Sequence, residues 1–517
     1  MPDVEPSLQK SPIFRVRGQT NMLYPNVDLN PENTETLSNI NLTERGTAKV
    51  RDGYAKYNTT QITESSVAKD VTGIAQLPFK AGTELVLFAG TVFNEETGGT
   101  RTARTGSLSL TDNAELRWRI VFFQDSMIAT NGTDETVRWT GSGNATDLTS
   151  SANIPFTVVK DIVPHRNLLV FLRPTVSGTD HTTRVMWCDL NLRQYTADIT
   201  NVPTDSFAEV YDQGAPIVGG VDFNDTLYIF KEDGFYPCRI SYDTGFFELD
   251  ILGAIRGFEP IAVNSLVTRV GSPSFLWVVA RDGAYVVNPA DNSFTLITRE
   301  LQNDWLNLAQ DRLQYAVSWI RQKDHQVRTL LSSASNSTGH DRVLVWDWET
   351  GDAWFDTPKD QINYAASAII SNKEYDFLGS SDGFIHQGND EDQAQDNDVS
   401  FDWDIQHVPT DLGFPGIEKN IINAVTYYRA QTGQQTIQFA VNRDQGRSTK
   451  VSTNLTLGTS QKWDTGLKWD SGLTWPGGTN AKQSVFVNRM AETVAAQWSG
   501  DQGAEIQAVQ YEFVVAE

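Results

Sequence analysis

The chain has 517 residues and a formal net charge of −24, with 65 acidic against 41 basic side chains. This length exceeds what one compact core holds, so two or three domains are expected, and 39% hydrophobic residues exclude wholesale disorder. The negative charge argues against a conventional DNA-binding protein and against attachment to an anionic membrane, because such a surface repels phosphate groups.

Cysteine use and the first residues narrow the class further. Two cysteines, Cys188 and Cys238, are too few for a disulfide framework or a zinc cluster, so we expect small buried side chains at matching places in neighbouring repeats. The opening MPDVEPSLQK lacks the basic and apolar regions of a secretory signal, and no run approaches the ~18 apolar residues of a membrane helix. We therefore expect synthesis in a cytosol and no membrane insertion.

The sequence of residues 1–60 predicts an extended N-terminal arm that ends in a hairpin. Residues 1–17 are polar and are expected to stay loose until they meet a partner. Pro25 and Pro31 break any helix. The run Lys49-Val50-Arg51 is strand-like, and the turn Asp52-Gly53 would deliver the chain into its first sheet.

Residues 61–395 repeat one pattern, an apolar strand, an Asp-Gly pair and an aromatic strand. The pairs are Asp233-Gly234, Asp282-Gly283 and Asp382-Gly383, and each predicts a hairpin with a type I′-like turn. A period of roughly 40–50 residues with several strands per unit is typical of β-propeller blades. Five to seven blades fit this length, and we expect about six.

Two further regions depart from this repeat. Apolar residues at steps of three and four predict one amphipathic helix at 299–313, inserted on the side of the propeller. After residue 395 the strands lack the Asp-Gly period, so residues 396–517 are expected to form a separate β-rich domain, either a β-sandwich or a sheet closing against the arm. The predicted fold class is therefore all-β.

Residues 18–57 also carry a pattern of residue types. It combines a glycine start, an Asn-Val-Asp segment with prolines, asparagine and leucine steps, and the ending Gly-x-x-x-x-Arg-x-Gly-Tyr. These elements lie at Gly18, Asn26-Val27-Asp28, Asn39, Asn41-Leu42, Gly46 to Arg51, Gly53 and Tyr54. The pattern resembles the opening of the tail nozzle and hub proteins of short-tailed bacteriophages.

This resemblance implies a structural virion protein, not an enzyme. It implies a homohexamer beneath an adaptor ring, the head-to-tail connector, with a needle, plug or fibre protein at the far end and DNA only as passing cargo. Acidic residues facing the passage would keep DNA from adhering during ejection. The expected assembly contacts are Arg45, Lys49 and Arg51, an electrostatic match for an acidic neighbour, together with Asn26 and Asp28.

The alternative is a propeller that binds or cleaves glycans. The tandem copies of Asp-x-Gly-x-x-Trp at 463–475 resemble the Asp-box of sialidase-type propellers, with Asp470, Gly472 and Trp475 in the second copy. The copies lie outside the repeats and only six residues apart. A turn closed by a packed tryptophan is therefore favoured over a sialidase-type Asp-box. Carboxylate pairs such as Asp347 and Glu349 are expected to be solvated surface. No histidine spacing fits a metal site, so no catalytic, cofactor or metal residue is predicted.

Overall fold

The computed structural model describes residues 8–19, 32–42, 47–191, 196–210, 214–243, 246–336, 338–388, 395–429, 435–444, 448–457, 480–501 and 504–515. In these residues the chain is all-β, which confirms the predicted class. None of the helices in this part has the length and apolar character that a membrane crossing requires.

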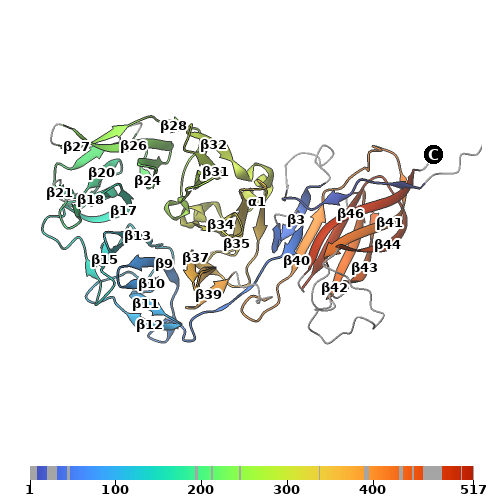
Figure 1. Cartoon of the computed structure of the whole chain (residues 1–517), viewed down its shortest axis with the longest axis horizontal. Coiled ribbons are helices and arrows are strands. Elements are labelled where there is room, and N and C mark those ends of the chain that lie inside the picture. Colours follow the sequence, from blue (N-terminus) through green and yellow to red (C-terminus); the bar gives the residue numbers. More distant parts are fainter. Residues whose placement is uncertain are drawn as a thin grey trace, which may run out of the picture.

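Seven antiparallel sheets follow one another between Tyr54 and Gly388 in the described residues (Figure 1). The first three comprise β9 (Val71–Phe79), β10 (Gly82–Ala89), β11 (Val92–Thr97) and β12 (Thr100–Ala103); β13 (Arg119–Phe123), β14 (Ser126–Thr130), β15 (Val137–Trp139) and β16 (Thr146–Asp147); and β17 (Phe156–His165), β18 (Leu168–Val176), β19 (Thr179–Asp180), β20 (Arg184–Trp187) and β23 (Phe207–Glu209). Two small hairpins accompany them, β7 (Thr63–Glu64) with β8 (Val67–Ala68) and β21 (Asp189–Asn191) with β22 (Thr196–Asp198).

The remaining four sheets have the same meander order. They comprise β24 (Ile217–Phe223), β25 (Thr226–Lys231), β26 (Gly234–Asp243), β27 (Phe246–Ile251) and β28 (Ile255–Arg256); β29 (Val267–Arg269), β30 (Phe275–Ala280), β31 (Gly283–Asn288) and β32 (Ser293–Leu296); β33 (Val317–Arg321), β34 (Gln326–Leu331), β35 (Arg342–Asp347) and β36 (Ala353–Asp356); and β37 (Ile362–Ile370), β38 (Lys373–Ser380), β39 (Ile385–Gly388) and β6 (Tyr54–Lys56). The last strand of the seventh sheet therefore comes from the start of the chain.

The seven sheets lie around a common centre (Figure 1). The first strand of each sheet contacts the first strand of the next, and β37 of the seventh contacts β9 of the first. The described residues thus contain one sheet more than the expected six units. An Asp-Gly pair lies between the second and third strands of the fourth, fifth and seventh sheets only, so these pairs could not fix the number of sheets.

Two further sheets form a sandwich beside the ring of seven. One contains β4 (Ile40–Leu42), β5 (Ala48–Val50), β46 (Glu505–Val515), β41 (Lys419–Arg429) and β44 (Asn480–Ala491), with β1 (Gln9–Lys10) and β2 (Phe14–Arg15) also paired to β46. The other contains β3 (Thr34–Ser38), β40 (Trp403–His407), β45 (Val494–Gly500), β42 (Gln435–Arg443) and β43 (Ser448–Leu457). The buried Trp498 joins the two layers, since its Nε1 donates to Thr426 Oγ1 at 3.2 Å.

The arm is part of this sandwich. Strands β1 to β5 lie within its two sheets, and Figure 1 shows the blue N-terminal strands among the orange and red C-terminal ones. Phe14, Leu37 and Ile40 are buried in its core. The expectation that residues 1–17 stay loose is therefore wrong for the described residues from Leu8 onward, because their apolar side chains complete a core within the same chain.

The Asp-Gly pairs do not form type I′ turns. Gly234 pairs with Lys231 and Gly283 with Ala280, so each glycine begins a strand after the two-residue turn. A type I′ turn needs positive φ at both central residues. The structure has such pairs between the first and second strands of the sheets, at Gln124-Asp125 (φ 47° and 57°), Asn224-Asp225 (47° and 62°) and Ser371-Asn372 (51° and 62°).

The Asp-Gly pairs have a different role. The carboxylate of Asp233 accepts a hydrogen bond from the Tyr236 hydroxyl at 2.9 Å, and Asp282 accepts one from Tyr285 at 2.7 Å. A Cβ atom on Gly234 would lie 2.1 Å from the Ile255 carbonyl oxygen, which excludes any side chain there. At the third pair, Gly383 has a φ of 78°, in the left-handed region that favours glycine.

The predicted helix at 299–313 is wrong as a single element. The structure has three short helical segments instead, η4 (Ile297–Leu301), α1 (Gln302–Leu306) and η5 (Gln310–Tyr315); a further segment, η3 (Val263–Ser265), lies before β29. The Gln310 side chain donates to the Trp305 carbonyl oxygen at 2.8 Å, and the extended Ala309 separates the last two segments. The apolar periodicity was nevertheless informative, because Leu301, Trp305 and Leu313 are buried.

Both cysteines are free and buried, which confirms the prediction. Cys188 follows β20 and Cys238 lies on β26, the third strands of two neighbouring sheets. Burial raises the pKa of each thiol to about 12. Neither thiol is therefore a nucleophile at neutral pH.

Candidate functional site

Two polar regions lie within the described residues: a joint between the sandwich and the ring of sheets, and a cavity in the ring. The joint centres on Arg51, which follows β5. Its guanidinium forms a bidentate ion pair with the Asp396 carboxylate, with Nη1 2.8 Å from Oδ1. The guanidinium carbon also lies 4.0 Å from the centroid of the Phe401 ring. Arg51 is 7% exposed and Asp396 is fully buried, so the pair lies out of water.

Three residues of the arm pattern surround this pair. Asn39 Oδ1 accepts hydrogen bonds from Arg51 Nε at 2.9 Å and from the Thr357 backbone N–H at 3.0 Å. Gly53 has no room for a side chain, because a Cβ atom would lie 2.0 Å from the Gln395 carbonyl oxygen. The Tyr54 hydroxyl accepts from the Asp360 N–H at 3.0 Å, and burial raises its pKa.

The joint continues into the sixth and seventh sheets. Arg328 Nη2 donates to Asn41 Oδ1 at 3.0 Å, which ties β34 to another position of the arm pattern. Asp376 accepts from Trp319 Nε1 at 2.9 Å and lies 3.6 Å from Arg321. Burial, with Arg321 nearby, lowers the pKa of Arg328 to about 10. These groups border a small cavity of about 40 Å³.

The predicted assembly residues therefore have different outcomes in the structure. Arg51 is an internal contact, so its role as an exposed cation for a neighbouring chain is wrong: Asp396 of the same chain neutralises it. Lys49 keeps a half-exposed side chain, 3.2 Å from the Asp52 carboxylate. Asn26, Asp28 and Arg45 lie outside the described residues, as do the predicted turn residues Asp470, Gly472 and Trp475.

The cavity has a volume of about 360 Å³ and opens among the second, third, fourth and fifth sheets. Its lining includes the cationic side chains of Arg117, Arg119, Lys160, Arg173 and Arg281, and the carboxylates of Glu115 and Glu232. A cationic excess therefore lines this cavity in a chain whose net charge is −24. The sequence did not predict this cavity: Arg117 and Arg119 stand close together in the chain, but the other cations come from distant positions.

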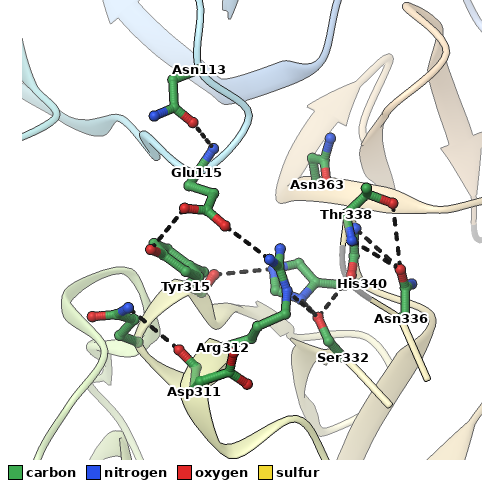
Figure 2. A network of polar contacts seen from close by, with 12 residues as sticks. Asn113, Glu115, Asp311, Arg312, Tyr315, Ser332, Asn336, Thr338, His340 and Asn363 are labelled. Carbon is green, nitrogen blue, oxygen red and sulfur yellow. Dashed lines mark hydrogen bonds and ion pairs between the residues drawn. The ribbon is translucent and has the colours of Figure 1, made fainter. Parts of the chain in front are cut away.

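One wall of the cavity is a polar network (Figure 2). The Glu115 carboxylate accepts from Arg312 Nη1 at 2.9 Å and from the Tyr315 hydroxyl at 3.0 Å. Behind it, the buried His340 contacts the Ser332 hydroxyl at 3.0 Å and the Tyr315 carbonyl oxygen at 3.1 Å. Burial, with Arg117 and Arg312 nearby, holds the pKa of His340 well below its ordinary value.

Arg119 and Asp161 connect three sheets beside the cavity. Arg119 Nε on β13 lies 3.3 Å from the buried Asp161 carboxylate on β17, and its Nη2 donates to the Gly220 carbonyl oxygen on β24 at 3.4 Å. Asp161 in turn accepts from the Gly220 N–H at 2.8 Å. Burial raises the pKa of Asp161 despite Arg119. This cluster is structural, because the Asp161 carboxylate and the Arg119 guanidinium contact each other and the Gly220 backbone of a third sheet.

The described residues contain no group of three or more His, Cys, Asp or Glu side chains that could hold a metal ion. The expectation of a solvated surface pair is wrong for Asp347, which is 4% exposed. Its Oδ1 accepts from the Glu349 N–H at 2.8 Å and the Thr350 N–H at 3.1 Å, so it caps a turn.

No family model and no curated protein matches the chain. Among solved structures, the extracellular domain of a hybrid two-component system from B. thetaiotaomicron is 9% identical, with 65% of this chain and 39% of that chain covered and a TM-score of 0.40. The extracellular domain of a one-component system from the same organism is 11% identical, with coverages of 82% and 58% and a TM-score of 0.41. The WD40 domain of Neurospora crassa Pan2 is 8% identical, with coverages of 68% and 99% and a TM-score of 0.39. At this level of similarity, none of the three bears on the function of this chain.

Proposed function

We propose that the chain is a structural subunit of a short bacteriophage tail, the nozzle or hub through which DNA leaves the virion. The observation that carries this proposal is the place of the arm pattern. Asn39, Arg51 and Gly53 meet at the joint between the sandwich and the ring of sheets. Hydrogen bonds fix Asn39 and Arg51 there, and Gly53 has no room for a side chain. The residues that carry the resemblance thus have an architectural task, as expected of an assembly protein.

We further propose that the seven sheets form a β-propeller. The support is the meander order of the sheets and the contacts between their first strands, which run from β9 round to β37. The sandwich contains the chain segments that precede and follow the propeller, so the propeller is inserted between two halves of the sandwich. Arg51 lies where the chain leaves the sandwich and Asp396 where it returns, so their ion pair fixes the two parts to each other.

In the proposed assembly, identical subunits form a ring, with a homohexamer expected, docked beneath an adaptor ring and closed at its far end by a needle, plug or fibre protein. The work of such a ring is physical. Screening limits the reach of its charge to a Debye length of about 8–10 Å, so the residues that face the passage decide how DNA slides. Acidic side chains there would deny DNA the counterion release that drives its adhesion to proteins.

A glycan-binding or glycan-cleaving propeller is the second candidate. The cavity in the ring favours it, since a concave site with converging polar groups is the usual form of a small-molecule site. Hydrolysis would need two carboxyl groups in separate roles. Of the two that line the cavity, Glu115 is already engaged by Arg312 and Tyr315.

The mass of the purified full chain in solution, alone and with its adaptor ring, tests the first candidate. We expect a ring-sized oligomer, most sharply in the presence of the adaptor, and no release of reducing sugar from host polysaccharide. A chain that stays monomeric with the adaptor and cleaves polysaccharide would reverse the ranking. Glu115→Gln and Glu232→Gln variants would then identify the acid and the base.

A further inference from the structure

The charge of the cavity runs against that of the whole molecule. Many of its cations are already neutralised: Arg119 by Asp161, Arg173 by Asp180 and Arg281 by Glu259. Two are not. Among the described residues, neither Arg117 nor Lys160 has a carboxylate partner within ion-pair distance.

Arg117 is the more unusual of these two cations, because it is 5% exposed. Its Nη2 donates to Asn363 Oδ1 at 3.3 Å, while its Nε and Nη1 are buried without a hydrogen-bond partner. Burial lowers the pKa of Arg117 to about 10, so it remains charged at neutral pH. A buried guanidinium with two unsatisfied donors is costly, which makes it a group that a bound anion would satisfy.

Lys160 lines the same cavity from β17. Its aliphatic stem packs against the Gly132 backbone, and burial, with Arg173 nearby, lowers the pKa of its ammonium group. Neither cation has a carboxylate within ion-pair distance in the described residues, so each favours an anionic ligand in the cavity that both line. Both cations would therefore bind the same class of ligand, an anion.

A third unsatisfied group adds an acceptor. Asn264 is 7% exposed and lines the cavity, and its Oδ1 has no hydrogen-bond partner in the described part of the chain. An amide oxygen accepts hydrogen bonds, so it would pair with a hydroxyl group of a ligand. The volume of about 360 Å³ falls at the small end of the range for small-molecule sites.

We propose that this cavity binds a small hydroxylated acid, with its phosphate or carboxylate group held by Arg117 and Lys160 and a hydroxyl group held by Asn264. Guanidinium and ammonium groups both recognise such oxyanions, the first through paired N–H donors and the second as a point charge. This site is independent of the proposed tail function. An assembly subunit with a ligand site and a soluble binding protein are both compatible with it.

Calorimetric titration of the full chain at constant ionic strength tests the site. The probes are glucose 6-phosphate and glucuronate, which differ in the oxyanion, with glucose as the neutral sugar and inorganic phosphate as the bare anion. We expect saturable binding of at least one sugar acid, weaker binding of inorganic phosphate and none of glucose. Comparison of the two sugar acids identifies the oxyanion source.

Three variants locate the binding. Lys160→Gln and Arg117→Gln should each weaken the affinity at least tenfold, and Lys80→Gln, which removes an exposed cation elsewhere, should leave it unchanged. Thermal unfolding in the absence of ligand verifies that each variant folds, and Lys160→Gln decides the matter if Arg117→Gln does not. Absence of binding by both sugar acids, or affinity unchanged in Lys160→Gln, would overturn the proposal.

Discussion

Arg51 anchors the joint between the sandwich and the ring of sheets through a buried ion pair with Asp396, 345 positions away. Neither residue type nor local spacing signals such a pairing, because it depends on where the chain returns after the seven sheets. Gly53 is comparable: the sequence identified a turn, but the close approach of Gln395 explains why glycine is required.

Breaking this pair should destabilise the protein strongly. Asp396→Asn leaves Arg51 buried without its counter-charge, and removal of one partner of a buried pair costs about 3–5 kcal/mol of unfolding free energy. Urea unfolding of the full chain measures the loss. Asp398→Asn, an exposed neighbour, is the matched control and should stay within about 0.5 kcal/mol of the parent. Equal stability of the two variants would contradict the joint.

His340 should make stability depend on pH. Its folded-state pKa lies well below 6.5, so below that pH the unfolded chain binds a proton that the folded chain does not. Stability present above the unfolded pKa is therefore lost on acidification, by up to about 1.4 kcal/mol per pH unit for this group. His340→Gln should remove this share of the slope between about pH 6.5 and pH 5, measured by urea unfolding. An unchanged slope would show that His340 is protonated in the folded chain.

At the scale of elements, the sequence predicted strands and hairpins well and their partners poorly. The alternation of apolar residues and the turn pairs located most strands of the ring, because these are local signals. The pairing of β1, β2, β3 and β5 with strands more than 350 residues later is a long-range event that no local pattern encodes. The segments between 297 and 315 show a second limit of sequence-based prediction. Their apolar residues recur at helical spacing, although the backbone forms three short segments and not one helix.

The arm strands should be necessary for the sandwich. Removal of residues 1–45 deletes β1 to β4, with the buried side chains of Phe14, Val16, Leu37, Ile40 and Leu42. At about 1.5–3 kcal/mol each, their burial contributes roughly 8–15 kcal/mol, comparable to the whole stability of a domain. We expect the truncated chain to lose cooperative unfolding of the sandwich, followed by calorimetry and limited proteolysis.

Deletion of residues 1–7 removes no described strand and provides the control for this truncation. A chain without residues 1–45 that unfolds like the parent, and loses only its docking to the adaptor ring, would support the arm as a free docking segment. That outcome would contradict its role in the sandwich.

At the scale of the whole molecule, the all-β class followed from composition and strand pattern, while the arrangement of parts did not. The sequence divided the chain into arm, repeats and C-terminal domain in series. The structure joins the first and last of these into one sandwich around an inserted ring of sheets. The cavity was not predicted for the same reason, since its cations lie in or beside the second, third and fifth sheets, which only the fold brings together.

Electron microscopy of the full chain mixed with its adaptor ring distinguishes the proposed ring-forming tail subunit from a separate monomer. We expect closed rings of identical subunits stacked coaxially on the adaptor, each with a disc of sheets beside a sandwich. Separate monomers that leave the adaptor ring bare at concentrations well above those of assembly would contradict the proposal.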